Sequence, residues 1–129
     1  MANSFKPTNY NSLSPYFIVE EAQKFIDLLQ NIFGAEELRK YKNSDGSIMH
    51  AEMKIDDSIL MLGEASEKYP PIQQLVHLYV TDAKEIYDRA LVAGCVSVEP
   101  PKTQDGDSDI RATFKDFAGN GCLAGLVVC

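Results

Sequence analysis

The sequence lacks several features that would assign it to a common class of protein. No apolar stretch approaches the roughly 20 residues that a membrane-spanning helix needs. Only 3 cysteines occur in 129 residues, an odd number without metal-like spacing, so we expect reduced thiols and no disulfide framework. Residues Met1 to Pro7 lack the apolar core of a secretion signal, and we therefore expect a cytoplasmic protein without membrane partners.

Positive charge is also scarce. The chain has 12 Lys and Arg against 19 Asp and Glu, a net charge of −7, and no basic cluster to neutralise a phosphate backbone. Nucleic acid is therefore excluded as a partner. A hydrophobic content of 45% with 24% charged residues is ordinary for a soluble globular protein. An acidic surface is compatible with a cationic small molecule as the ligand.

Recognisable catalytic motifs are absent as well. The sequence has no Gly-x-Ser-x-Gly, no Cys–His pairing and no nucleotide-binding signature. The acidic segment 105–109 looks like the start of a calcium loop, but Ile110 stands where such a loop needs glycine. We expect no calcium site there.

The most informative feature is an internal repeat at an offset of about sixty residues. The matching pieces are 19–22 with 80–83, 42–46 with 102–106, and Asp56 with Asp116. Two copies of one unit predict two sheets with equivalent faces, and a cleft between such faces is a natural small-molecule site. We expect one domain over residues 1–129, with repeat one at about 13–63 and repeat two at about 74–129.

Each repeat has the pattern of a β-α-β-β-β unit. In the first, apolar residues at helical spacing and Gly34 at the end predict the helix. The predicted elements are strand Pro15–Val19, helix Glu20–Phe33, and strands Glu36–Lys42, Ile48–Ile55 and Ser58–Leu62. A linker over 63–73 follows, with Pro70 and Pro71.

The second repeat has the same order. Thr81 and Asp82 should cap its helix, Gly94 should end it, and Pro100 should end the strand that follows. The predicted elements are strand Leu75–Val80, helix Ala83–Ala93, and strands Cys95–Glu99, Ile110–Lys115 and Cys122–Val128.

Strand alternation assigns the candidate binding residues. On the third strand Met49, Ala51, Met53 and Ile55 should pack under the helix, which leaves His50, Glu52 and Lys54 on the helix-free face. Arg111 is added as a clamp for a carboxylate or phosphonate. The predicted ligand-binding set is Tyr16, His50, Glu52, Met61, His77, Tyr79 and Arg111.

Each candidate also has a structural interpretation. The two histidines could be hydrogen-bonded within the sheet, and Glu52 could pair with Lys54 or Arg111. Arg111 could instead pair with Asp107 or Asp109, and Tyr16 and Tyr79 could cover an ordinary core. In the functional interpretation Glu52 orients His50 or His77 as an acid–base pair.

Several segments resemble the glyoxalase/bleomycin resistance (vicinal oxygen chelate) superfamily. They are Ser14-Pro15-Tyr16, 32–36, 48–55, 57–62, His77-Leu78-Tyr79-Val80 and 116–119. The chain looks like the glyoxalase-like branch of unassigned activity. The resemblance implies an α+β fold in which two βαβββ repeats form a curved mixed-sheet cup, and it implies a homodimer.

The resemblance also implies four metal-ligand positions, which here hold Ser14, Met61, Leu75 and Leu123. None is a good ligand for a hard divalent ion. We therefore expect a metal-free protein without a cofactor that binds a small molecule, such as a drug or a cationic metabolite. The alternative is a lyase or isomerase whose divalent metal ion is held by His50, Glu52 and His77.

Overall fold

The structure is a computed structural model that describes residues 5–103, 110–117 and 123–124. The β-α-β-β-β order occurs twice, as the repeat predicted. The elements are β1 (Tyr16–Val19), α1 (Ala22–Phe33), β2 (Glu36–Lys42), β3 (Ile48–Ile55), β4 (Ser58–Glu64), β5 (Gln74–Leu75), α2 (Ala83–Val92), β6 (Val96–Thr103), β7 (Ile110–Lys115) and β8 (Leu123–Ala124). In the described part of the chain, neither helix is long and apolar enough to span a bilayer.

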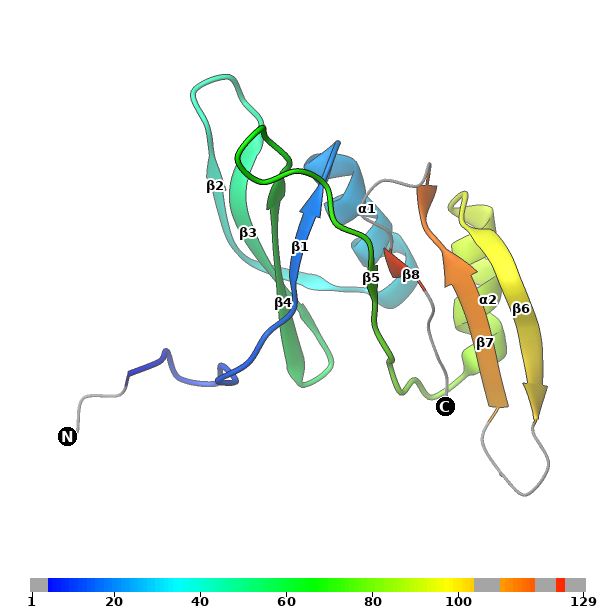
Figure 1. The fold of residues 1–129 in the computed structure, drawn as a ribbon. Coiled ribbons are helices and arrows are strands. Elements are labelled where there is room, and N and C mark those ends of the chain that lie inside the picture. The colour runs from blue at the N-terminus through cyan, green and yellow to red at the C-terminus, as the bar shows by residue number, and fades with distance from the viewer. Residues whose placement is uncertain (1–4, 104–109, 118–122, 125–129) are drawn as a thin grey trace.

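The first unit is a four-stranded sheet in the order β1-β4-β3-β2, with β1 parallel to β4 and the other pairs antiparallel. Helix α1 covers one face of this sheet (Figure 1). Its side chains Phe25, Ile26, Leu29 and Ile32 are fully buried. Burying an aliphatic or aromatic side chain contributes about 1.5–3 kcal/mol, so this face fixes the helix on the sheet.

Both ends of α1 are held by local features. Gly34 ends the helix in the left-handed region (φ 65°), as the sequence predicted. At the start, Glu21 also has a left-handed backbone and caps nothing with its side chain. The Glu64 carboxylate on β4 instead accepts hydrogen bonds from the backbone N–H groups of Glu21 and Ala22, at 2.9 and 3.0 Å. The helix start is therefore tied to the sheet edge that carries β1 and β4.

The second unit contains the parallel pair β5-β8 and the antiparallel pair β6-β7. Asp82 caps α2, as predicted, because its carboxylate accepts from the Glu85 N–H at 3.0 Å. Ala90 and Phe114 join the hydrophobic core of the first unit. Helix α1 lies on the side of the first sheet that faces α2, β6 and β7, so the opposite face of that sheet points away from the second unit (Figure 1).

The prediction that Pro100 and Pro101 end a strand was wrong. Strand β6 continues through both prolines to Thr103, with register irregularities between Ser97 and Lys102. Proline is tolerated in an edge strand, where no neighbouring strand needs its missing N–H as a donor. Strand β6 is such a strand in the described part of the chain, because its one described partner is β7.

The strand predicted over Leu75–Val80 is also shorter than expected, since β5 covers only Gln74–Leu75. Residues 76–80 have no strand pairing among the described residues, although Val76 and Leu78 still pack against the core. Of the predicted final strand Cys122–Val128, Leu123–Ala124 form β8, and the remaining residues lie outside the described part. Asp107 and Asp109, considered above as partners of Arg111, also lie outside it.

Candidate functional site

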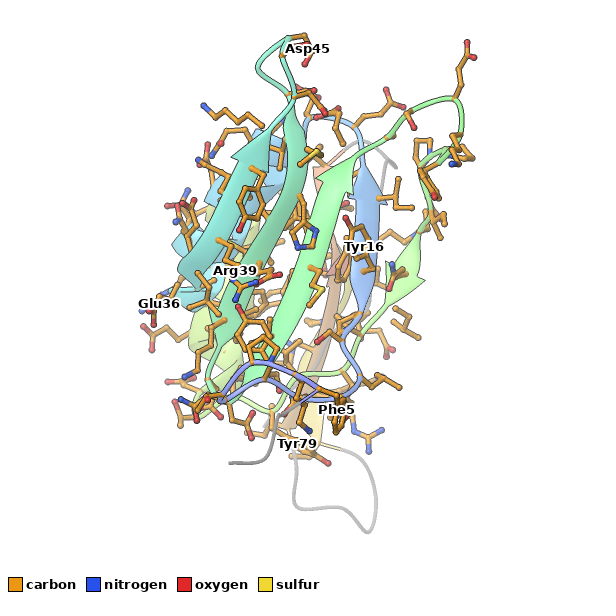
Figure 2. The ribbon with its side chains drawn as sticks, turned by 90° about the vertical axis from the view of Figure 1, so that its left-hand side faces the viewer. Phe5, Tyr16, Glu36, Arg39, Asp45 and Tyr79 are labelled. Atoms are coloured by element: carbon orange, nitrogen blue, oxygen red, sulfur yellow. The ribbon has the colours of Figure 1, made fainter. Side chains whose placement is uncertain are left out.

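The helix-free face of the four-stranded sheet, here called the outer face, carries one row of side chains across all four strands. The pairing register places Tyr16 beside Met61, Met61 beside Glu52, and Glu52 beside Arg39. Tyr16 and Arg39 both lie on this face (Figure 2). Strand alternation therefore located Tyr16, Glu52 and Met61 correctly as a group.

One assignment on β3 was wrong. Met49 was predicted to pack under the helix, but Ile48 is buried there and Met49 is 53% exposed. The register explains the difference, because Tyr41 pairs with His50 and Lys42 pairs with Ile48. Met49 is the extra residue of a β-bulge, which changes the alternation locally and turns its side chain outward.

His50 connects two other members of the row. The Tyr16 hydroxyl lies 3.0 Å from His50 Nδ1, and His50 Nε2 lies 2.8 Å from a carboxylate oxygen of Glu52. The imidazole also stacks against Tyr41, with ring centroids 6.3 Å apart. Both ring nitrogens are therefore hydrogen-bonded, and the orientation of the ring is fixed.

Glu52 is the buried end of this series of hydrogen bonds, with only 5% of its surface exposed. Its second oxygen accepts a hydrogen bond from the Tyr10 hydroxyl, and Arg39 Nε lies 3.6 Å from the same oxygen. Burial raises the pKa of Glu52, but the hydrogen bonds from Tyr10 and His50 and the charge of Arg39 outweigh it and leave that pKa below its ordinary value. Glu52 is thus a carboxylate at neutral pH, and its ion-pair partners among the described residues are Arg39 and His50, in place of the Lys54 or Arg111 considered above.

The charge on Glu52 affects both tyrosines. Its hydrogen bond to Tyr10, followed by burial, raises the pKa of Tyr10. Burial, followed by the negative charge of Glu52, raises the pKa of Tyr16. Both phenols therefore keep their protons at neutral pH.

A hollow of about 740 Å³, here called the outer hollow, lies beside Tyr16. Its walls come from β1, β3, β4 and the segment after β4, and they include Tyr16, Ile18, Met49, Glu64, Tyr69 and Ile72. The segment after β4 is held in place because the Ile72 N–H donates to the Ile18 carbonyl at 3.1 Å. The walls are mainly aromatic and aliphatic, and their polar side chains are those of Asn43, Glu64 and Ser66 together with the two tyrosine hydroxyl groups.

Three predicted site residues lie elsewhere in the chain. His77 and Tyr79 contact each other edge-on, with centroids 4.7 Å apart, and line a separate hollow of about 460 Å³ with Phe17 and Ile55, here called the end hollow. Arg111 is on β7, opposite Lys102. The structure therefore brings Tyr16, His50, Glu52 and Met61 together. His77, Tyr79 and Arg111 are not part of this group.

Sequence reasoning missed three residues that shape this site. Tyr10 precedes the first predicted strand, and nothing in the sequence links it to Glu52. Arg39 was detectable, because the predicted strands 36–42 and 48–55 are close neighbours in sequence, and their antiparallel pairing brings Arg39 next to Glu52. Gly63 was placed in the linker, although it belongs to β4.

The metal-ligand positions implied by the family do not fit a divalent ion in this chain. Met61 is next to Tyr16 on the outer face and offers a thioether, while Leu75 is 77% exposed and aliphatic. Ser14 offers only a hydroxyl. Hard divalent ions prefer carboxylate oxygen or imidazole nitrogen, which none of these positions supplies. In the described part of the chain, His, Cys, Asp and Glu do not gather in groups of three or more suited to a metal.

Comparison with known proteins agrees with this architecture. An uncharacterized protein of Mycobacterium bovis is 31% identical over a 98-residue alignment. The match covers 67% of this chain and 64% of the relative, so it spans less than two thirds of that protein. The crystal structure of TioX from Micromonospora sp. ML1 is similar with a TM-score of 0.69, at 19% identity, covering 91% of this chain and 93% of TioX.

A fosfomycin resistance protein, FosX from Listeria monocytogenes, is similar with a TM-score of 0.63, at 19% identity and 85% coverage of each chain. That structure is of a mutant of FosX complexed with Mn(II) and 1S,2S-dihydroxypropylphosphonic acid. The family profile described as Glyoxalase/Bleomycin resistance protein/Dioxygenase superfamily matches residues 11–122. The chain therefore belongs to the glyoxalase/bleomycin resistance protein/dioxygenase superfamily.

Proposed function

We propose that the protein binds a small amphipathic molecule in the outer hollow without the help of a metal ion. The observation that carries this proposal is a group of exposed apolar side chains around one hollow. Tyr16, Met49, Tyr69 and Ile72 are 41–55% exposed and all line it. Grouped apolar exposure of this kind marks a binding surface, and a mainly apolar hollow with few polar groups is typical of ligand sites.

The chemistry of the walls favours a planar ligand that carries positive charge. Tyr16 and Tyr69 offer ring faces, which attract both aromatic groups and cations. Glu64 also lines the hollow, with its carboxylate bound to the N–H groups of Glu21 and Ala22, and the net charge of the chain is −7. A drug-like or metabolite-like aromatic cation satisfies these features. A binding role in the cytoplasm is compatible with the odd number of cysteines.

We also propose that the protein acts as a homodimer in which the partner covers the outer face. The described part of the second unit does not cover it, since α1 and that part lie on the opposite side of the sheet (Figure 1). The second unit also exposes apolar side chains, with Val96 62% and Val98 49% exposed on β6. Pairing two such surfaces from two copies would remove both from water. Sedimentation of the wild type and of Val98→Lys tests this arrangement; a monomeric wild type contradicts it.

Proflavine, a planar aromatic cation, is a suitable probe for the binding role. We expect it to bind the wild type in the presence of EDTA, with a fluorescence anisotropy increase that saturates. Tyr69→Ala should weaken this binding at least tenfold, because it removes one wall of the outer hollow. Tyr79→Ala tests the end hollow and should leave the affinity within about twofold, which corresponds to less than about 0.5 kcal/mol.

The metal-dependent lyase or isomerase is the rival that this experiment must separate. Native mass spectrometry of freshly purified protein reports bound metal, bound small molecule and subunit number together. A stoichiometric Zn, Ni, Mn or Fe ion, with proflavine binding that disappears in EDTA, contradicts the proposed function. Turnover of the methylglyoxal–glutathione adduct that EDTA abolishes would support the rival.

A further inference from the structure

We propose that Tyr16, His50 and Glu52 form a proton relay that removes a proton from a small molecule bound in the outer hollow. This inference rests on the proposed binding function and goes beyond it, because it assigns a reaction class to the same surface. The relay runs from the exposed Tyr16 hydroxyl through both nitrogens of His50 to a buried carboxylate.

The hydrogen bonds give the relay a direction. Glu52 is a carboxylate that can only accept, so His50 Nε2, at 2.8 Å, must carry the hydrogen. In a neutral imidazole Nδ1 then has the free electron pair, and it accepts the hydrogen of the Tyr16 hydroxyl at 3.0 Å. Because the Tyr16 hydroxyl donates its hydrogen to His50, the lone pairs of the Tyr16 oxygen can accept a hydrogen bond from a ligand.

The surrounding groups support this arrangement. Tyr10 and Arg39 occupy the second oxygen of Glu52 and hold the carboxylate in place. Tyr41, on β2, stacks on the imidazole, and Tyr69 lines the outer hollow. Gly63 has no side chain to displace the Tyr16 hydroxyl, since a Cβ there would lie only 3.2 Å from that oxygen.

The chemical step is a balanced proton transfer. A C–H, N–H or O–H bond of the ligand breaks, and its electron pair stays on the ligand atom. The Tyr16 oxygen forms the new O–H bond while its original proton moves to His50 Nδ1. Glu52 then faces an imidazolium, whose positive charge it stabilises, and the reverse transfer returns a proton to the ligand or to solvent.

This arrangement selects a substrate class. The molecule needs an acidic hydrogen that can reach the Tyr16 oxygen and an apolar or planar portion for Ile18, Met49 and Ile72. A carbon acid, such as the position next to a carbonyl or an activated aromatic C–H, fits both needs. An imidazole-assisted general base typically accelerates such a reaction about 10²- to 10⁴-fold.

Nitrogen NMR of the free protein tests the relay without any ligand. In ¹⁵N-histidine-labelled protein, the neutral His50 ring should carry its hydrogen on Nε2 and leave Nδ1 unprotonated. Tyr16→Phe should shift the Nδ1 signal, Glu52→Gln should shift the Nε2 signal, and His77 should be unchanged in both. A protonated Nδ1 in the neutral ring, or an Nδ1 signal that ignores Tyr16→Phe, overturns the proposal whether or not any probe binds.

Ring opening of 5-nitrobenzisoxazole tests the proton transfer itself. A base removes its C–H proton, the N–O bond breaks, and a coloured cyanophenolate is released. We expect the wild type in EDTA to accelerate this reaction, with at least a tenfold loss of rate in Tyr16→Phe and in His50→Gln. Tyr87→Phe, which removes a phenol hydroxyl outside both hollows, should retain the rate.

The two proposals fail in different ways. If proflavine does not bind the wild type, the binding role is contradicted. The relay is then tested by the NMR measurement, which needs no ligand. Proflavine binding without any acceleration, or a Tyr16→Phe variant as fast as the wild type, would overturn the relay and leave the binding role standing.

Discussion

Gly63 and Tyr16 are linked by a close approach across two neighbouring strands. A Cβ atom at position 63 would lie 3.2 Å from the Tyr16 hydroxyl oxygen and 2.8 Å from the Met49 carbonyl oxygen. The second distance involves backbone and is shorter than real Cβ contacts allow. Glycine at this position therefore lets the phenol lie over β4 and reach His50.

Gly63→Ala should separate Tyr16 from His50. We expect a stability loss of about 1–3 kcal/mol from the forced backbone shift. The His50 Nδ1 resonance should move toward its position in Tyr16→Phe. The double variant Gly63→Ala/Tyr16→Phe should shift that resonance no further than Tyr16→Phe alone. Additive shifts in this cycle would show that the two residues act independently.

Glu52 should make the protein sensitive to acid in a defined way. Its pKa is lower in the folded protein than in the unfolded chain, so its contribution to stability is complete above the unfolded value of about 4.3. That contribution is lost as the pH falls through the lower, folded pKa. Glu52→Gln should lower the free energy of unfolding by about 1–3 kcal/mol at neutral pH. Measured by urea unfolding, this free energy should also fall less steeply at acid pH in the variant than in the wild type, which gives a flatter acid limb.

The matched control for that experiment is Glu36→Gln, an exposed glutamate on the same sheet. It should leave both the neutral stability and the acid limb close to those of the wild type. Equal acid limbs in the wild type and Glu52→Gln would contradict the assignment of Glu52 as a stabilised carboxylate.

Glu64 should stabilise the start of α1 from a distance in sequence. Glu64→Ala removes the acceptor for the N–H groups of Glu21 and Ala22, so we expect a loss of about 0.5–2 kcal/mol. Thermal or urea unfolding measures the loss, and Glu67→Ala, an exposed neighbour on the same segment, is the control. A Glu64→Ala variant as stable as the control would show that the cap contributes nothing.

Local pattern was sufficient for much of the fold. The bounds of β2, β3 and β7 agree with their predicted ranges, and α1 differs only at its start. Gly34 and Asp82 end and start their helices as expected because capping depends on nearby residues. The grouping of Tyr16, His50 and Glu52 also followed from alternation, which is a local property of each strand.

The features that sequence reasoning missed depend on contacts between distant segments. The outward turn of Met49 comes from a bulge against Tyr41 and Lys42, and a single strand carries no signal for it. Tyr10 reaches Glu52 across 42 positions of sequence. The passage of β6 through its prolines depends on its position next to β7, which composition does not reveal.

The central claim is that a small molecule binds on the outer face, and methionine methyl NMR tests it most directly. Met49 and Met53 lie on the same strand, the first 53% exposed beside the outer hollow and the second fully buried under α1. Titration of ¹³C-methyl-methionine protein with proflavine in EDTA should shift Met49 and leave Met53 in place. An unchanged Met49 signal at saturating proflavine, or an equal shift of Met53, would contradict the account.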